Sequence, residues 1–120
     1  MTAHAHHARK YVDTRLPEHN AFRFLLTDGE SVVAHNVIEF HRAAQQVPQA
    51  SLRHHLGNGD FSRWTAQILG DEPLARGLRK LERSVAAGAA PDRAEILAHI
   101  EDRYLIGTRK LDWGGEPTAT

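Results

Sequence analysis

Residues 36 to 82 read NVIEFHRAAQQVPQASLRHHLGNGDFSRWTAQILGDEPLARGLRKLE, and they carry the clearest structural code in the chain. Apolar side chains recur there at the three- and four-residue spacing of amphipathic helices. The breaks between these periodic runs hold residue types that start or stop helices. The segment therefore predicts three consecutive helices, with polar side chains gathered at the break between the second and the third.

The first of these helices should begin after Asn36. An asparagine side chain can accept a hydrogen bond from a free backbone N–H of the first helical turn, and Glu39 completes a capping-box pattern. Pro48 should end the helix, because proline disfavours helical geometry in the residue before it. The apolar stripe comprises Val37, Phe40, Ala44 and Val47.

The second helix is short, and we expect it over Ser51 to Leu56. It should stop at Gly57-Asn58-Gly59, because these residue types favour turn or left-handed backbone geometry. Asp60 has the character of a helix cap, so we expect it to begin the third helix. The buried face of that helix should carry Phe61, Trp64, Thr65 and Ile68.

The same signals predict two further helices. Gly70 should end the third helix and Asp71 should cap the fourth. After a loop over residues 88 to 91, Asp92 and Glu95 repeat the capping pattern at the start of the last helix. The apolar stripes are Leu74, Leu78, Leu81 and Val85 in the fourth helix, and Ile96, Leu97, Ile100 and Tyr104 in the last.

The residues before Asn36 follow a different pattern. From Ala21 to Leu26 the pattern alternates: in a strand, Phe22, Phe24 and Leu26 would point one way and Arg23 and Leu25 the other, and a second short run covers Ser31 to Val33. Asp28-Gly29 lies between the two runs, and an Asp-Gly step in this position is typical of a β-hairpin. A hairpin and a single extended segment packed on the helices both fit so short a pattern.

Together these elements predict a mainly α, small single-domain helical bundle of four to five helices, with a short N-terminal β-hairpin or extended segment. A chain of 120 residues suits one domain. We expect the helical domain over residues 20–110, between a flexible arm over residues 1–19 and a flexible tail over residues 111–120.

The composition narrows the classes of function. The 15 basic and 15 acidic side chains balance, so no overall charge favours nucleic acid or an anionic membrane. The absence of cysteine excludes disulfides, thiolate metal sites and cysteine nucleophiles. No apolar run approaches the length of a membrane span. We expect a histidine-rich cytoplasmic protein with no cofactor and with neither nucleic-acid nor membrane partners.

Three ordered motifs stand in the central segment. They are Ser51-Leu52-Arg53-His54-His55, Gly59-Asp60-Phe61-Ser62-Arg63-Trp64 and Leu69-Gly70-Asp71-Glu72-Pro73-Leu74-Ala75. With the aromatic residues from Phe22 onward, they make the segment up to Glu82 resemble an uncharacterised prokaryotic domain family. That family occurs alone or fused to larger proteins, some of them carbohydrate-active. The resemblance implies mainly a fold, and it aligns His55 with the family histidine.

Polar residues around the central turn form a candidate ligand site, comprising His55, Asp60, Arg63 and Trp64. A histidine exchanges protons near neutral pH, and the start of a helix attracts anions. Roles in the fold explain the same residues, with Asp60 as a cap, His55 bonded to a backbone carbonyl and Trp64 in the core. No nucleophile motif accompanies His55, so no catalytic residue is assigned.

Metal binding is predicted only for the N-terminal arm. On a helix the adjacent His54 and His55 would diverge by about 100°, which is unsuitable for joint chelation. If Met1 is removed, the chain begins Thr2-Ala3-His4, whose amine, two amides and imidazole can form a square-planar site for Cu(II) or Ni(II). The candidate ligands in the arm are His4, His6 and His7.

Four basic side chains share one face of the fourth predicted helix: Arg76, Arg79, Lys80 and Arg83. Such a face can contact phosphates, but nucleic-acid binding would also need aromatic side chains for base stacking, and none are interleaved here. We expect a solvated surface or pairing with acidic residues of the last helix, namely Asp92, Glu95, Glu101 and Asp102.

An interaction surface is the remaining candidate. Trp113 lies outside the last apolar stripe, where it would anchor a partner, a second copy of the chain or its own domain. We expect a non-enzymatic helical module for protein interaction or regulation, with a protein partner or as a homo-oligomer. The first alternative is a small-ligand or catalytic site at His55, Asp60 and Arg63, and the second is Cu(II) or Ni(II) binding by the arm.

Overall fold

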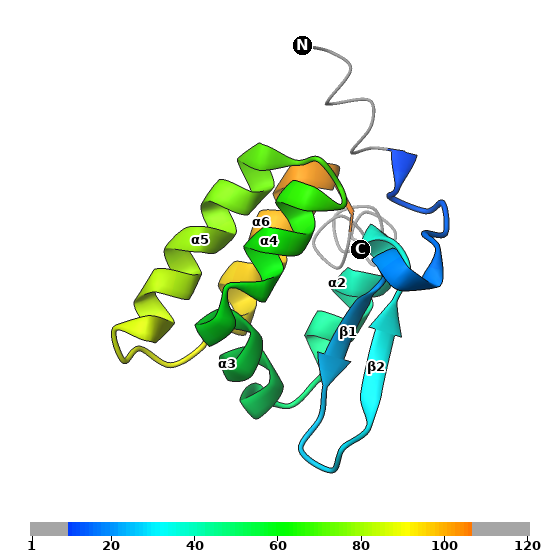
Figure 1. Cartoon of the computed structure of the whole chain (residues 1–120). Helices are drawn as coiled ribbons and strands as arrows, with labels where there is room; N and C mark the ends of the chain where they lie inside the picture. The colour runs from blue at the N-terminus through cyan, green and yellow to red at the C-terminus, as the bar shows by residue number, and fades with distance from the viewer. Residues whose placement is uncertain (1–9, 107–120) are drawn as a thin grey trace, which may run out of the picture.

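The computed structural model describes residues 10 to 106, and Figure 1 shows helices packed beside a two-stranded hairpin. The predicted class, a small helical domain with an N-terminal hairpin, is confirmed for these residues. The strands β1 (Phe22–Leu25) and β2 (Ser31–Ala34) are antiparallel and follow a short 3-10 helix, η1 (Glu18–Asn20). The α-helices are α2 (Val37–Gln46), α3 (Gln49–Asn58), α4 (Asp60–Gln67), α5 (Glu72–Ala86) and α6 (Arg93–Tyr104).

Three of the four predicted caps are confirmed. The side chains of Asn36, Asp71 and Asp92 each accept a hydrogen bond from the backbone N–H three residues further on. Each such bond satisfies a group that the helix itself leaves free, and its loss should cost about 1 kcal/mol. The prediction for Asp60 is wrong, because Asp60 is already the first residue of α4 and its side chain makes no cap bond.

The start of α4 is capped from another helix. Glu82 of α5 accepts hydrogen bonds from the Ser62 N–H at 2.9 Å and from the Ser62 hydroxyl at 2.7 Å. A carboxylate is favoured at this position by the free N–H groups and the dipole of the helix. Since Glu82 takes this role, the carboxylate of Asp60 is available for other partners.

The break between α3 and α4 is a single residue. The turn predicted over Gly57-Asn58-Gly59 is wrong in its extent, because Gly57 and Asn58 continue α3. Gly59 alone is left-handed, with a φ of 71°, and α4 begins at the next residue. The two helices therefore meet at a sharp corner, and this corner brings the end of α3 close to the first turn of α4.

An aromatic cluster joins the hairpin to the helices. Phe40 and Trp64 stack with their ring centroids 5.0 Å apart, and the indole N–H of Trp64 donates to the Asn20 carbonyl at 2.8 Å. Trp64 is only 7% exposed, which confirms its predicted place in the core. Because an isolated two-stranded hairpin is marginally stable, these contacts hold it in place. The cluster comprises Phe22, Phe24, Phe40, Phe61 and Trp64.

Part of the expected N-terminal arm belongs to the domain. Leu16 is 2% exposed, and its N–H donates to the His35 carbonyl at 2.7 Å. The first N–H groups of α2, at Val37 and Ile38, donate to carbonyls of residues 11 and 12, which satisfies groups that a helix start leaves free. Residues 1–9 and 107–120, including the predicted tail and Trp113, lie outside the described residues.

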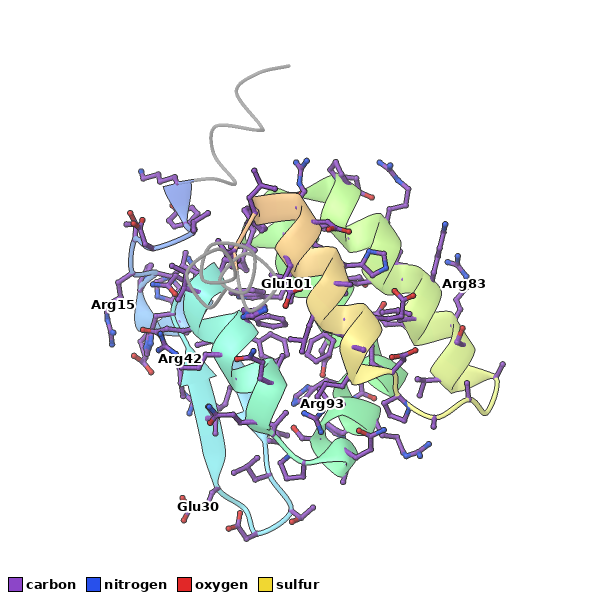
Figure 2. The ribbon with its side chains drawn as sticks, turned by 180° about the vertical axis from the view of Figure 1, so that it is seen from behind. Arg15, Glu30, Arg42, Arg83, Arg93 and Glu101 are labelled. Carbon is purple, nitrogen blue, oxygen red and sulfur yellow. The ribbon has the colours of Figure 1, made fainter. Side chains whose placement is uncertain are left out.

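The last helix is fastened to α2 by polar side chains that Figure 2 labels. Arg93 donates to the Ala44 and Val47 carbonyls at the end of α2, and Glu101 lies 2.8 Å from the buried His41. Because Glu101 interacts with His41 of α2, it does not pair with the basic face of α5 as predicted. The predicted pairing of that face with α6 also fails for Arg79, which bonds Glu72 of its own helix.

Within residues 10 to 106, no helix combines the length and the apolar character that crossing a membrane would require.

Candidate functional site

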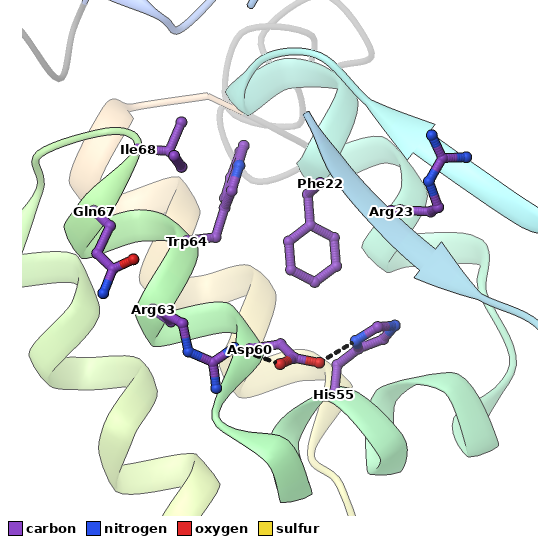
Figure 3. A pocket seen from close by; sticks show the side chains of 8 residues that line it. All are labelled: Phe22, Arg23, His55, Asp60, Arg63, Trp64, Gln67 and Ile68. Carbon is purple, nitrogen blue, oxygen red and sulfur yellow. Dashed lines mark hydrogen bonds and ion pairs between the residues drawn. The ribbon is translucent and has the colours of Figure 1, made fainter. Parts of the chain in front are cut away.

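All four predicted site residues meet at the corner between α3 and α4, next to β1 (Figure 3). His55 comes from the last turn of α3, and the other three come from α4. They line a hollow of about 240 Å³. Its complete lining is Phe22, Arg23, His55, Asp60, Arg63, Trp64, Gln67 and Ile68.

Both ring nitrogens of His55 are occupied inside the protein. Nδ1 lies 2.8 Å from Asp60 Oδ2, and Nε2 lies 3.0 Å from the backbone N of Leu25. A backbone N–H can only donate, so Nε2 accepts and the ring proton lies on Nδ1, where it is donated to Asp60. The predicted bond from His55 to a backbone carbonyl is therefore wrong, because the backbone partner is an N–H.

The surroundings fix the charge of this pair. Burial lowers the pKa of His55 below its ordinary value, and the neighbouring carboxylate of Asp60 only partly opposes that shift. Burial raises the pKa of Asp60, but hydrogen bonds from His55 and Arg63 outweigh it and leave the pKa below its ordinary value. At pH 7 the site therefore contains a neutral imidazole bonded to an ionised carboxylate.

Arg63 closes the solvent side of the corner. Its Nη1 donates to Asp60 Oδ1 at 2.8 Å, and its Nη2 donates to the Asn58 carbonyl at 2.7 Å. Both carboxylate oxygens of Asp60 thus have a donor. A continuous series of hydrogen bonds runs from the Leu25 backbone through His55 and Asp60 to the exposed guanidinium of Arg63.

This arrangement suits a structural link better than acid–base chemistry. A general base needs a free lone pair within reach of its substrate. The only lone pair of the neutral His55 ring points at the Leu25 N–H, and the residue is 3% exposed. Polar contacts to a ligand in the hollow would have to come from its rim, where the exposed guanidinium of Arg63 lies.

A metal ion at the corner would have to displace existing bonds. His54, His55 and Asp60 place one potential ligand atom each within 4.8 Å of one another. Coordination by His55 requires a free lone pair, but Nδ1 carries the proton donated to Asp60 and Nε2 is engaged by Leu25. The arm residues His4, His6 and His7 lie outside the described residues, so the metal site there stays a prediction.

A second hollow, which the sequence did not predict, lies between β2 and α2. We call it the β2–α2 groove; it has a volume of about 380 Å³. On the helix side, Glu39, Ala43 and Gln46 recur at helical spacing, and of these Ala43 is buried in the core while Gln46 is exposed. The groove is lined by Arg15, Val32, Val33, His35, Glu39, Arg42, Ala43 and Gln46.

The outer edge of β2 beside this groove is open within residues 10 to 106. The sheet has two strands, and the Leu26 N–H donates to the Glu30 carbonyl at their turn. Hydrogen-bonded and non-bonded pairs alternate along an antiparallel ladder, so the backbone groups of Ser31 and Val33 point away from β1. Leu25 is paired with Ser31 in this ladder, and its N–H likewise points away from the opposite strand, where it donates to His55.

Comparison with known proteins adds no relative: no protein-family model matches the sequence, and neither a curated protein nor a solved structure gives a significant match. The likeness of its motifs to the uncharacterised prokaryotic family stays a prediction. Function has to be inferred from the corner, the groove and the open edge of β2.

Proposed function

We propose that this protein is a small, non-enzymatic protein-interaction module that binds an extended segment of a partner protein along β2. The observation that carries the proposal is the open edge of β2 beside the β2–α2 groove. Outward backbone groups at a strand edge can pair with an added strand, while a neighbouring groove receives alternate side chains of that strand.

The dimensions of the groove support this mode of binding. The groove has a volume of about 380 Å³, and Val32 in its lining is 37% exposed, whereas Ala43 on the helix side is buried. In a strand, successive side chains point to opposite faces. Every second side chain of a bound segment would therefore face the groove and meet Val32, while its backbone pairs with Ser31 and Val33.

The α3–α4 corner supports a non-enzymatic role. It is the place where the sequence put its candidate ligand site, and the described residues there leave no ring nitrogen of His55 free for proton transfer. The alternative, a small-ligand site, would then depend on the exposed rim of the hollow. Binding at that rim would perturb Arg63 and Trp64 and leave β2 unchanged, which separates the two hypotheses.

A peptide selection tests the proposal. The full chain is immobilised and used to select binders from a displayed library of random twelve-residue peptides. Selected peptides are synthesised and added to ¹⁵N-labelled protein. We expect the backbone amide signals of Ser31 and Val33 to shift on titration. A library that yields no binder would overturn the proposal, as would binders that shift only residues at the α3–α4 corner.

A matched pair of variants makes the selection specific to the edge. Val33→Pro removes an outward N–H without removing a bond to β1, a position at which an edge strand tolerates proline. Val33→Thr keeps that N–H and a β-branched side chain. Loss of the backbone bond should weaken peptide binding about tenfold in Val33→Pro and little in Val33→Thr. Unfolding curves of both variants establish that each one is folded.

A further inference from the structure

We propose that the β2–α2 groove selects an acidic extended segment, whose carboxylates are bound by Arg15 and Arg42. The inference rests on the proposed function, and it adds the chemistry of the partner. Both arginines line the groove, and Figure 2 labels them on the side of the molecule that β2 and α2 form. Neither arginine belongs to a site predicted from the sequence.

Arg42 is the first element of the inference. It lies on α2 and is exposed. Among the described residues it has no hydrogen-bond or ion-pair partner, in contrast to Arg63, Arg79 and Arg103, which all bind carboxylates. A guanidinium carries five N–H donors in a planar fork that fits a carboxylate. Arg42 therefore presents an unused carboxylate-binding group at the groove.

Arg15 is the second element. Its Nη2 lies 3.2 Å from Nε2 of His35, and Glu18 Oε1 lies 3.0 Å from the same nitrogen. That nitrogen can accept from Arg15 or donate to Glu18, but it cannot do both. Within residues 10 to 106, Arg15 thus has at most one hydrogen bond, to the His35 ring, and it attracts the carboxylates of Glu18 and Glu39 without a direct bond to either. A carboxylate from a partner can give it a direct charge-assisted bond.

The only acidic residue of the groove lining is already engaged. Glu39 Oε1 accepts from the His35 backbone N–H at 2.7 Å and lies 3.1 Å from His35 Nδ1. The backbone bond from His35 lowers the pKa of Glu39, with a further contribution from the ring after the opposing effect of burial. The Glu39 carboxylate also attracts Arg15, which lowers the pKa of Glu39 further. The groove lining therefore carries two guanidiniums against one carboxylate, and this excess of positive charge attracts anions.

Charge complementarity also distinguishes between the kinds of segment that could bind in the β2–α2 groove. A second copy of this chain, pairing β2 with β2, would offer Ser31-Val32-Val33-Ala34, a strand without a carboxylate, and the one acidic residue next to that strand is Glu30 at the hairpin turn. One carboxylate beside the strand does not satisfy both Arg15 and Arg42. A basic segment would meet two like charges at close range. An extended segment with aspartate or glutamate satisfies both the open backbone edge and the two guanidiniums.

The test uses the peptides selected on the wild-type chain. We expect them to be enriched in aspartate and glutamate relative to the starting library. Arg42→Glu should weaken binding of a selected acidic peptide at least tenfold. Arg53→Glu is the matched control, because Arg53 is exposed on α3, lies outside the groove lining and forms no hydrogen bond or ion pair within residues 10 to 106. It should change the affinity less than twofold.

A charge swap completes the test. Replacing the acidic residues of the peptide with lysine should abolish binding to the wild type and restore part of it with Arg42→Glu. Selected peptides without acidic enrichment that still need the Val33 N–H would overturn this inference and leave the proposed function intact. Peptides that bind independently of the Val33 N–H would overturn both proposals. Self-association of the chain through β2 would also overturn this inference, because the occupant of the groove would then be a second copy.

Discussion

At the scale of single residues, His55 has the most consequential contacts. Its ring lies against Phe22 and Phe61, and its two nitrogens bond to Leu25 and Asp60. These contacts connect β1, the end of α3 and the start of α4. The residue that the sequence singled out as a candidate reactive group therefore acts as the polar link between hairpin and helices.

Replacing His55 with phenylalanine tests this role. The substitution keeps an aromatic ring of similar size but leaves the Leu25 N–H and one oxygen of Asp60 without their partners. Unpaired buried groups are costly, so we expect a loss of about 2 to 4 kcal/mol in the free energy of unfolding, measured with urea. His54→Phe, at an exposed neighbouring position, should change it by less than about 0.5 kcal/mol. Equal effects of the two substitutions would contradict the account.

Lowering the pH should weaken the connection that His55 makes between the hairpin and the helices. The pKa of His55 is lower in the folded chain than its ordinary value of about 6.5. As the pH falls below that value, the unfolded chain takes up the proton first, so stability declines toward the folded-state pKa and is fully retained above about 6.5. Protonation also places an N–H of His55 against the N–H of Leu25. Asp60 titrates at lower pH, outside this window.

The measurement compares unfolding free energies at pH 7 and pH 5 for the wild type and His55→Phe. Other histidines, including His35 and His41, are present in both proteins, so the difference between them isolates His55. We expect the wild type to lose more stability than the variant. If both lose the same amount, His55 does not titrate as its burial requires.

Local patterns predicted residues whose partners are close in sequence. Asn36, Asp71 and Asp92 each cap the helix that begins beside them, because the bond spans three residues. Asp60 has the same appearance, yet its cap position is taken by Glu82 of α5. A contact between residues twenty apart leaves no pattern in a short stretch of sequence, so the cap by Glu82 could not be predicted, although the actual partners of Asp60, His55 and Arg63, are near it in the chain.

At the scale of elements, the corner between α3 and α4 positions the candidate site. The sequence identified the break but made it three residues long, because glycine and asparagine disfavour helices. The helix α3 nevertheless continues through Gly57 and Asn58, which are both exposed, and ends at Gly59. Only Gly59 needs the freedom of glycine, because a left-handed φ of 71° strains other residues.

Two alanine substitutions separate these glycines. Gly57 is helical and an added methyl group would meet nothing within 4 Å, so Gly57→Ala should raise the free energy of unfolding by about 0.5 to 1 kcal/mol. Gly59→Ala should lower it by about 1 kcal/mol or more, through backbone strain. Thermal unfolding of both variants decides the point. If both substitutions destabilise the protein by a similar amount, the result would favour a turn over Gly57-Asn58-Gly59 in place of a break at Gly59 alone.

The hairpin was predicted only in part from the sequence. Asp28-Gly29 indicated the turn, and Gly29 has the positive φ that such turns use. The alternation of Phe22 and Phe24 indicated one buried face, but nothing local distinguished a paired strand from an extended segment. The second strand packs against α2, and a short sequence pattern cannot predict such contacts between elements.

At the scale of the whole molecule, the β2–α2 groove brings Arg15 next to β2 and α2, which are consecutive in the chain. Arg15 comes from a segment that lacks periodicity and was therefore assigned to the arm. That segment is attached by backbone bonds to the start of α2, which leave no trace in side-chain patterns, and Leu16 is its single large buried residue. The bundle was predictable from apolar spacing, whereas the groove depends on this packing.

The most direct measurement is amide hydrogen exchange of β2 in the full chain, free and bound to a selected acidic peptide. In the free protein, we expect Val32 and Ala34 to be protected by β1 and Ser31 and Val33 to exchange rapidly, because their N–H groups point outward. Bound peptide should slow exchange at Ser31 and Val33. The account is contradicted if these two amides are already protected in the free chain, or if peptide binding leaves their exchange unchanged.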